Sequence, residues 1–134
     1  MIKSNRRKFL ALAAGLAAVS SVKGNPLMTM KKKFLAHQVY FWLKNPDSAE
    51  DRTELIKGIK TLSKIESVRK LTIGVVAPTE KRSVIDDTWS VSELAIFNDV
   101  AGEAAYQVHP LHLDFVKKYS HLWSKVVIYD SSEV

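Results

Sequence analysis

Hydrophobic positions divide residues 34–131 into extended and helical segments. Residues 34–43 are rich in aromatic and β-branched side chains and predict a strand. Apolar residues from Leu55 to Ile65 recur at helical spacing and predict a helix, which begins after a capping pair of Ser48 and Asp51. Residues 67–77 and 88–97 predict two more strands, joined by a charged loop at residues 78–87.

The C-terminal part of the chain predicts a helical region and a last strand. The helical region starts near Asp99, is interrupted at His109-Pro110, and resumes with His112 and Phe115 on one apolar stripe. Residues 125–130 predict the fourth strand. The order βαββαβ predicts an α+β, ferredoxin-like fold: a four-stranded antiparallel sheet with two helices on one face.

The first predicted strand is apolar on both faces. His37, Val39 and Phe41 share one face, whereas Tyr40 and Trp42 share the other. Because antiparallel sheets commonly leave one face to water, a strand that is apolar on both faces needs a second layer. We therefore expect either layers on both sides of the sheet or a partner subunit that meets it sheet to sheet.

Residues 1–24 have the three parts of an export signal: a basic head, the apolar stretch Ala11–Val19, and an exit of small residues. The Arg6-Arg7 pair before Phe9-Leu10 resembles a twin-arginine signal. The apolar stretch is too short to span a bilayer, which needs about 20 residues. We expect a signal at residues 1–24, a linker at 25–33, a domain at 34–131, and a periplasmic or otherwise exported product without a stable membrane anchor.

Composition and charge exclude several classes of function. The chain has 134 residues, 46% of them hydrophobic, and no cysteine, so disulfides, thiolate nucleophiles and thiolate-bound metals are excluded. The net charge is +6, but residues 1–24 hold five of the 20 basic and none of the 14 acidic residues, which leaves +1 for residues 25–134. The third predicted strand also lacks the basic, aromatic motif of RNA-recognition modules, so we expect no nucleic-acid partner.

Three of the four histidines belong to one candidate constellation. His37 lies on an apolar strand face, His112 lies on an apolar helix stripe, and Tyr106 precedes His109 by one helical turn. A buried imidazole without a partner costs about 1–3 kcal/mol, so His37 and His112 either bond a structural partner or line a pocket. His109 either enters the helix and bonds the local backbone or contacts a ligand. A zinc site from the three histidines would straddle Pro110 without an obvious fourth ligand, so we expect no metal.

This constellation resembles the stress-responsive dimeric α+β barrel family, often called Dabb. The resemblance lies in Tyr106-x-x-His109-Pro110-x-His112, the upstream strand histidine, Phe97-x-Asp99 and a closing Tyr129-Asp130, and it covers residues 34–131. Members of the family are homodimers in which two sheets close into a barrel, so the resemblance implies a dimeric α+β barrel here.

The resemblance also implies candidate catalytic residues. The best-understood member is a plant polyketide cyclase that works without a cofactor, and its functional histidines and tyrosine correspond to His112, Tyr106 and His37. We expect these three side chains to converge on a pocket, with the following ligand-binding neighbours: Val39, Phe41, His109 and Phe115.

Two functions remain open on this basis. The first is an exported homodimer that binds a small hydrophobic or aromatic carbonyl compound. The alternative is a cofactor-free cyclase or lyase that acts on a polyketide-like substrate, with His112 as the general base and Tyr106 holding a carbonyl or enolate oxygen. A haem-type monooxygenase on a similar barrel is a weaker third hypothesis, because no residue at a distinctive position marks a haem ligand. Neither of the first two functions calls for a cofactor.

Overall fold

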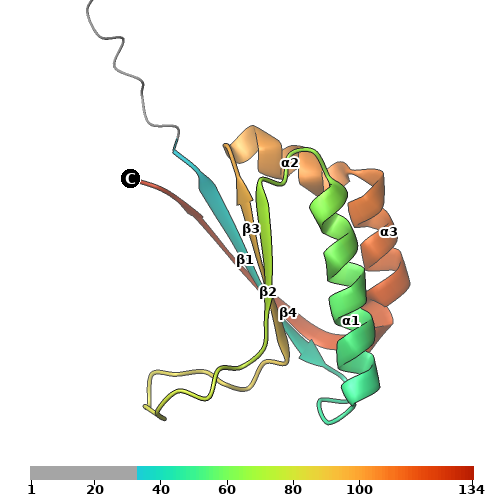
Figure 1. Ribbon diagram of the computed structural model, residues 1–134, viewed down its shortest axis with the longest axis vertical. Coiled ribbons are helices and arrows are strands. Elements are labelled where there is room, and N and C mark those ends of the chain that lie inside the picture. Colours follow the sequence, from blue (N-terminus) through green and yellow to red (C-terminus); the bar gives the residue numbers. More distant parts are fainter. Residues whose placement is uncertain (1–32) are drawn as a thin grey trace, which may run out of the picture. The chain divides into compact units, whose positions relative to one another are not determined.

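The computed structural model describes residues 33–134 (Figure 1). The expected export signal and the first residues of the linker lie outside the described residues. The elements follow in the order β1 (Leu35–Leu43), α1 (Ala49–Thr61), β2 (Lys70–Gly74), β3 (Val91–Phe97), α2 (Val100–Val108), α3 (Pro110–Tyr119) and β4 (Trp123–Ser132), with 3₁₀ turns at Leu62–Lys64 and Ser120–Leu122.

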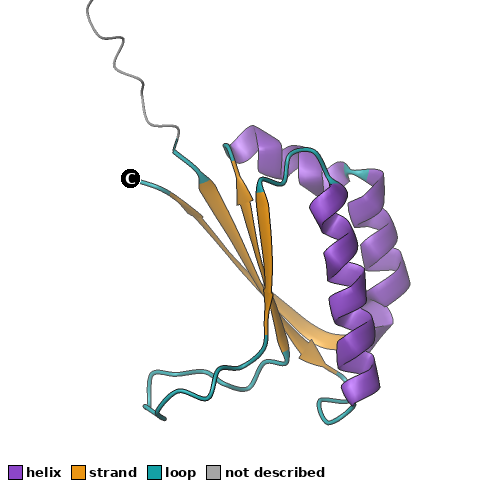
Figure 2. Ribbon diagram, in the orientation of Figure 1, coloured by secondary structure: helices purple, strands orange, loops and turns teal. Residues whose placement is uncertain are grey.

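The four strands form one antiparallel sheet in the order β2-β3-β1-β4. This is the ferredoxin-like arrangement, which confirms the predicted fold class. The helices cover one face of the sheet (Figure 2). Residues 33–134 form three α-helices rather than the predicted two, because the second helical region is divided. None of the helices in residues 33–134 is both long and apolar enough to cross a membrane.

The core lies between the sheet and the helices. Along β1, every second residue from Leu35 to Leu43 is buried, and the residues between them are only half-buried. The buried set contains Val39 and Phe41, which pack with Leu55 and Ile59 of α1. We call the other face of the sheet, which carries Tyr40 and Trp42, the open face, because no helix or strand of residues 33–134 covers it (Figure 2).

The second and third strands along the chain, β2 and β3, are shorter than predicted. β2 spans only the residues that pair with β3, and Val75 beyond it is exposed. β3 begins at Val91 instead of residue 88, because a local turn holds the preceding residues. In that turn the Thr88 backbone N–H donates to Asp86 Oδ1 at 2.9 Å, and the Trp89 indole N–H donates to the Asp86 carbonyl at 2.9 Å. β4 is longer than predicted, because its pairing with β1 extends to Ser132.

The expected interruption at His109-Pro110 is a complete break between α2 and α3. His109 has an extended backbone with ψ of 138°, and Pro110 begins α3. Proline lacks the N–H that would continue α2, and its ring disfavours helical backbone at the preceding residue. The first turn of a helix is where proline is tolerated, since its missing N–H would be unpaired there.

Candidate functional site

A cavity of about 130 Å³ lies between the sheet and the helices α2 and α3. We call it the site cavity. Six of the seven predicted site residues line it, from β1, α2 and α3. Its full lining is His37, Val39, Phe41, Glu93, Tyr106, Gln107, His112, Phe115, Val116, Trp123, Val126 and Ile128.

The three predicted catalytic side chains converge on this cavity. The ring centroids of Tyr106 and His112 are 4.6 Å apart, and those of His37 and Tyr106 are 5.7 Å apart. His37 reaches the cavity because β1 alternation turns it toward the helices. Tyr106 lies in the last turn of α2 and His112 in the first turn of α3, so the break between these helices brings the two rings together.

The structure fixes which nitrogen of His112 carries the proton in the neutral ring. His112 Nδ1 lies 3.1 Å from the Gln107 carbonyl oxygen. A carbonyl can only accept a hydrogen bond, so Nδ1 is the donor and Nε2 keeps its lone pair. Burial lowers the pKa of His112 below its usual value, although the Gln107 carbonyl partly opposes that shift. The neutral imidazole is therefore the favoured form near neutral pH, and its Nε2 can accept a proton.

His37 is held by a carboxylate. His37 is 2% exposed, and its Nδ1 lies 2.6 Å from Asp130 Oδ1 of β4. The Glu103 carboxylate of α2 is 4.0 Å from the same nitrogen and also accepts a hydrogen bond from the Gln107 amide. Because the carboxylate holds one side of the His37 ring, the tautomer and orientation of the ring are fixed. This suits a side chain whose role is to orient a neighbouring side chain or a ligand.

Tyr106 donates its hydroxyl hydrogen bond to a buried acid. The Tyr106 hydroxyl lies 2.8 Å from Glu93 Oε1, and each of the two residues is only 1% exposed. Burial raises the pKa of Glu93, and burial together with the nearby Glu93 charge raises the pKa of Tyr106. Tyr106 therefore stays a neutral hydroxyl group that can serve as a hydrogen-bond donor.

One group of ligand-type atoms lies beside the site cavity. His37, Glu103 and Asp130 each offer one such atom, and these atoms lie within 4.8 Å of one another. Tetrahedral zinc ligands at about 2.0–2.2 Å from the ion lie more than about 3 Å apart. The 2.6 Å separation of His37 and Asp130 has instead the geometry of a hydrogen bond.

His109 takes a different position from the other predicted site residues. Its side chain caps α3, because Nδ1 accepts a hydrogen bond from the Leu111 backbone N–H at 3.1 Å. Its Nε2 lies 3.4 Å from Glu66 Oε2. His109 is not among the residues that line the site cavity, and its contacts match the helix-entry alternative.

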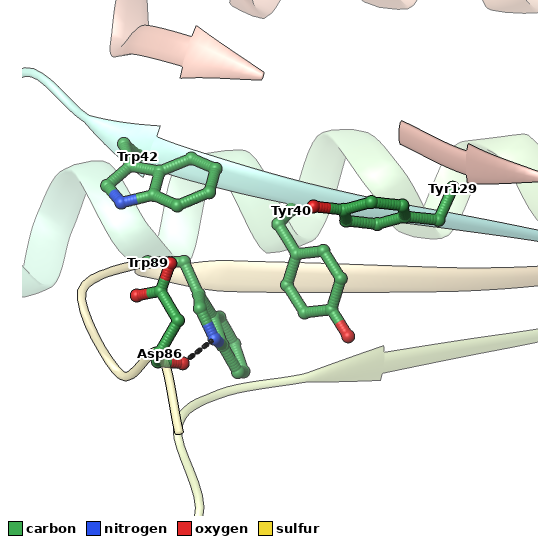
Figure 3. Close-up of a pocket in the computed structure, with 5 residues that line it drawn as sticks. All are labelled: Tyr40, Trp42, Asp86, Trp89 and Tyr129. Carbon is green, nitrogen blue, oxygen red and sulfur yellow. Dashed lines mark hydrogen bonds between the residues drawn. The ribbon is translucent and has the colours of Figure 1, made fainter. Parts of the chain in front are cut away.

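A second hollow, of about 370 Å³, lies on the open face (Figure 3). We call it the aromatic hollow, and its lining is Tyr40, Trp42, Asp86, Trp89 and Tyr129. The rings of Tyr40 and Trp89 lie 5.1 Å apart, and Lys125 Nζ is 4.5 Å from the Trp42 ring centroid. Two hydrogen bonds from Thr88 lower the pKa of Asp86. The hollow is separate from the site cavity, because alternate residues of β1 point to opposite faces.

Comparison with protein families gives a match over residues 35–133 to the model described as the stress responsive A/B barrel domain, Dabb. The chain belongs to the stress responsive A/B barrel family. This confirms the resemblance drawn from the His37 and Tyr106–His112 segments. A comparison with curated proteins finds no match.

Solved structures share the fold of this A/B barrel chain at low sequence identity. A Dabb family protein with a ferredoxin-like fold from Mesorhizobium loti is 22% identical, with a TM-score of 0.63 over 76% of this chain and 98% of that one. A dimeric ferredoxin-like protein of unknown function from Bacteroides fragilis is 21% identical, with a TM-score of 0.58 over 75% and 96%. A hydroxynitrile lyase from Passiflora edulis is 20% identical, with a TM-score of 0.64 over 77% and 95%.

Sequence reasoning missed two acids of the A/B barrel site, Glu93 and Asp130. Glu93 falls in the alternation of β3, whose other core-facing residues are Val91, Ala95 and Phe97. An acid in that series is a signal that a pattern search could have found. Asp130 belonged to the closing motif that carried the family resemblance, but nothing in the sequence pairs it with His37, which is 93 residues away.

Proposed function

We propose that this A/B barrel chain is an exported homodimer that binds a small hydrophobic or aromatic carbonyl compound in the site cavity. The observation that carries the proposal is the convergence of His37, Tyr106 and His112 on one cavity with otherwise largely apolar walls. A concave apolar site with a few convergent polar groups is the usual form of a small-molecule site. Its hydrogen-bonding groups suit an oxygen on an otherwise apolar ligand.

The size of the site cavity limits the ligand. Its volume is about 130 Å³. An engineered apolar cavity of about 150 Å³ binds benzene. A compound with a single ring and a carbonyl substituent therefore matches the site better than a long chain, and benzaldehyde is a suitable first probe.

Binding is tested by titrating the protein with benzaldehyde and following backbone amide signals by NMR. We expect saturable shifts at residues around the site cavity. Val126→Phe adds a ring to the wall of the cavity and should weaken binding at least tenfold. Val84→Phe adds the same ring at a position that is 84% exposed and should leave binding unchanged. Equal affinities of the two variants would contradict binding in this cavity.

Cofactor-free lyase or aldol-type chemistry is the second candidate function. It is supported by His112, whose Nε2 carries a lone pair and whose ring lies 4.6 Å from that of Tyr106. In hydroxynitrile cleavage, such a base takes the hydroxyl proton, the oxygen becomes a carbonyl, and cyanide leaves with the electron pair of the broken C–C bond. The Passiflora edulis neighbour is a hydroxynitrile lyase, which makes this reaction a reasonable first assay.

The assay follows benzaldehyde released from mandelonitrile. His112→Gln should lower the enzymatic rate by about 10²–10⁴-fold, because general-base catalysis contributes that much. His121→Gln changes the histidine that lies outside the constellation and should leave the rate unchanged. Equal rates for both variants and the natural protein would refute the role of His112, while binding in the cavity would be judged by the titration alone.

The homodimer is supported by the open face. Tyr40, Trp42 and Tyr129 lie there without a covering helix or strand in residues 33–134, and Tyr129 is 63% exposed. Burying a large aromatic side chain removes about 150–250 Å² from water, so three of them favour a covered face. The Bacteroides fragilis neighbour is described as dimeric, in keeping with this proposal.

Sedimentation velocity at micromolar concentration tests the dimer. Tyr40→Glu should give monomers or insoluble protein, because Tyr40 packs against the Trp89 and Tyr129 rings on this face and burying a charge there is costly. Lys57→Glu on the exposed surface of α1 is the control for a new acidic residue and should leave the dimer intact. A monodisperse, soluble monomer of the natural protein would refute the dimer.

Export is the remaining part of the proposal and rests on the pattern of residues 1–24. Replacing Arg6 and Arg7 by lysine keeps the charge but removes the twin-arginine pair. The variant should stay in the cytoplasmic fraction as a longer precursor, whereas the natural protein should be found outside the cytoplasm with an N-terminus near residues 20–26. Normal export of the lysine variant would refute the twin-arginine assignment.

A further inference from the structure

Glu93 is a buried acid for which the proposed chemistry has no role. It stands on the core face of β3, opposite Val39 of β1 and Ile73 of β2, so its strand neighbours are apolar. Glutamate is almost never fully buried unless it is paired. The partner of Glu93 is the Tyr106 hydroxyl, at 2.8 Å, and both residues line the site cavity.

The protonation state of Glu93 decides the direction of this hydrogen bond. An ionised carboxylate can only accept, so the Tyr106 hydrogen points to Glu93 and the tyrosine offers the cavity only oxygen lone pairs. A protonated carboxyl can donate to the Tyr106 oxygen instead. The Tyr106 hydrogen is then free to point at a ligand oxygen.

We propose that Glu93 is a positioning residue that directs the Tyr106 hydroxyl hydrogen, so that Tyr106 donates to a ligand carbonyl only while Glu93 is protonated. The inference rests on the proposed function, in which the site cavity holds a carbonyl compound. The inference adds to the proposed function which class of ligand is preferred in each protonation state of Glu93. Protonated Glu93 favours neutral acceptors such as aldehydes and ketones, and ionised Glu93 removes that preference.

Other titratable groups around Glu93 must be separated from its effect. Tyr106 and Glu103 approach from α2, His37 from β1, and His112 from α3. Asp130 of β4 contacts His37 and is the nearest acid on that side. Burial raises the pKa of Glu93, so its proton is retained above the pH at which an exposed glutamate ionises. The tests below therefore change Glu93 and Tyr106 directly.

The experiment compares the affinity of the protein for benzaldehyde and for toluene across pH. The two probes are close in shape and neutral throughout, but only benzaldehyde has an acceptor oxygen. The ratio of the two dissociation constants therefore reports the hydrogen bond to the carbonyl. We expect the preference for benzaldehyde to fall about three- to tenfold as the pH rises from about 5 to 9, which is the loss of one neutral hydrogen bond.

Two variants give the decisive comparison. Glu93→Gln cannot ionise, and its amide can still donate to the Tyr106 oxygen, so the preference should persist at high pH. Tyr106→Phe removes the donor, so the preference should be absent at every pH. The infrared spectrum supplies a readout without ligand, because the natural protein minus Glu93→Gln should contain a carboxylic-acid C=O band that disappears as Glu93 ionises.

The results that overturn the inference are distinct from those that overturn the proposed function. If neither probe binds the natural protein or Glu93→Gln, the proposed function fails and the inference fails with it. If both probes bind but the preference is the same at all pH values, or falls equally in Glu93→Gln, the proposed function stands and the role of Glu93 is refuted. Rescue of the high-pH preference by Glu93→Gln is an effect that a purely structural role would not produce.

Discussion

Replacing Glu93 by glutamine should make the protein more stable at high pH than the natural chain, and the advantage should grow with pH. Glu93 is 1% exposed, and within residues 33–134 the only group that donates a hydrogen bond to its side chain is the Tyr106 hydroxyl. Taking a charge into such surroundings is costly, which is why burial raises the pKa of Glu93. Glutamine has the same shape and carries no charge at any pH.

The sign and size of the effect follow from proton linkage. In the unfolded chain the glutamate ionises near its ordinary value of 4.5, whereas the folded protein holds the proton to higher pH. Between these two values the native state binds more protons, so the free energy of unfolding falls as the pH rises. One group gives a slope of at most about 1.4 kcal/mol per pH unit. At a pH below the pKa of the unfolded chain, the contribution of Glu93 to the free energy of unfolding does not change with pH. At a pH above the pKa of the folded protein, this contribution is again constant.

Urea unfolding of both proteins, from about pH 4 to pH 8, measures the slope. The difference in unfolding free energy should widen with pH above about 4.5 in favour of Glu93→Gln. Glu80→Gln, at an exposed position of the loop before β3, controls for the loss of one negative charge. A difference that is flat across this range for Glu93→Gln, or equal to that of Glu80→Gln, would refute the assignment of a retained proton to Glu93.

Three further outcomes are expected. Gly58→Ala should lower the melting temperature, because the new Cβ would lie 2.6 Å from the Tyr119 ring and overpacking costs about 1–3 kcal/mol, more than the roughly 1 kcal/mol that alanine gains as a helix former. His109→Ala should cost about 1 kcal/mol in urea unfolding, because it removes the cap on the Leu111 N–H, but it should not change benzaldehyde binding. His112→Gln should lessen the fall in stability as the pH drops below about 6.5, since the fold favours the neutral imidazole; an unchanged pH profile would contradict the lowered pKa of His112.

The fold could be predicted because local patterns agree with it at each step. The alternation in β1 identified the two faces of the sheet, and the capping pair of Ser48 and Asp51 is present, with the Asp51 N–H donating to Ser48 Oγ at 3.1 Å. Strand ends were predicted less well. Residues 75–77 and 88–90 are typical of strands, but a strand also needs a partner, and whether one is in reach depends on tertiary structure.

Only the part of the site that lies in the Tyr106–His112 segment could be predicted from the sequence. Tyr106 and His112 are close in sequence, and Pro110 between them signals the break that brings their rings together. The partners of these residues come from other strands. Asp130 meets His37 through the register of β1 with β4, in which the two residues are directly opposite, and no local signal encodes that register.

Glu93 illustrates why a pattern of apolar positions finds a core more readily than a site. An acid among Val91, Ala95 and Phe97 contradicts the pattern, and such local contradictions are expected where function requires them. The contradiction alone does not show what the acid does, because the same sequence would result from a glutamate on an exposed strand edge and from a buried glutamate with a hydrogen-bond partner. The Tyr106 hydroxyl 2.8 Å away decides between these possibilities. It makes Glu93 part of a hydrogen-bonded pair on the cavity wall, and a pair of this kind can respond to a ligand.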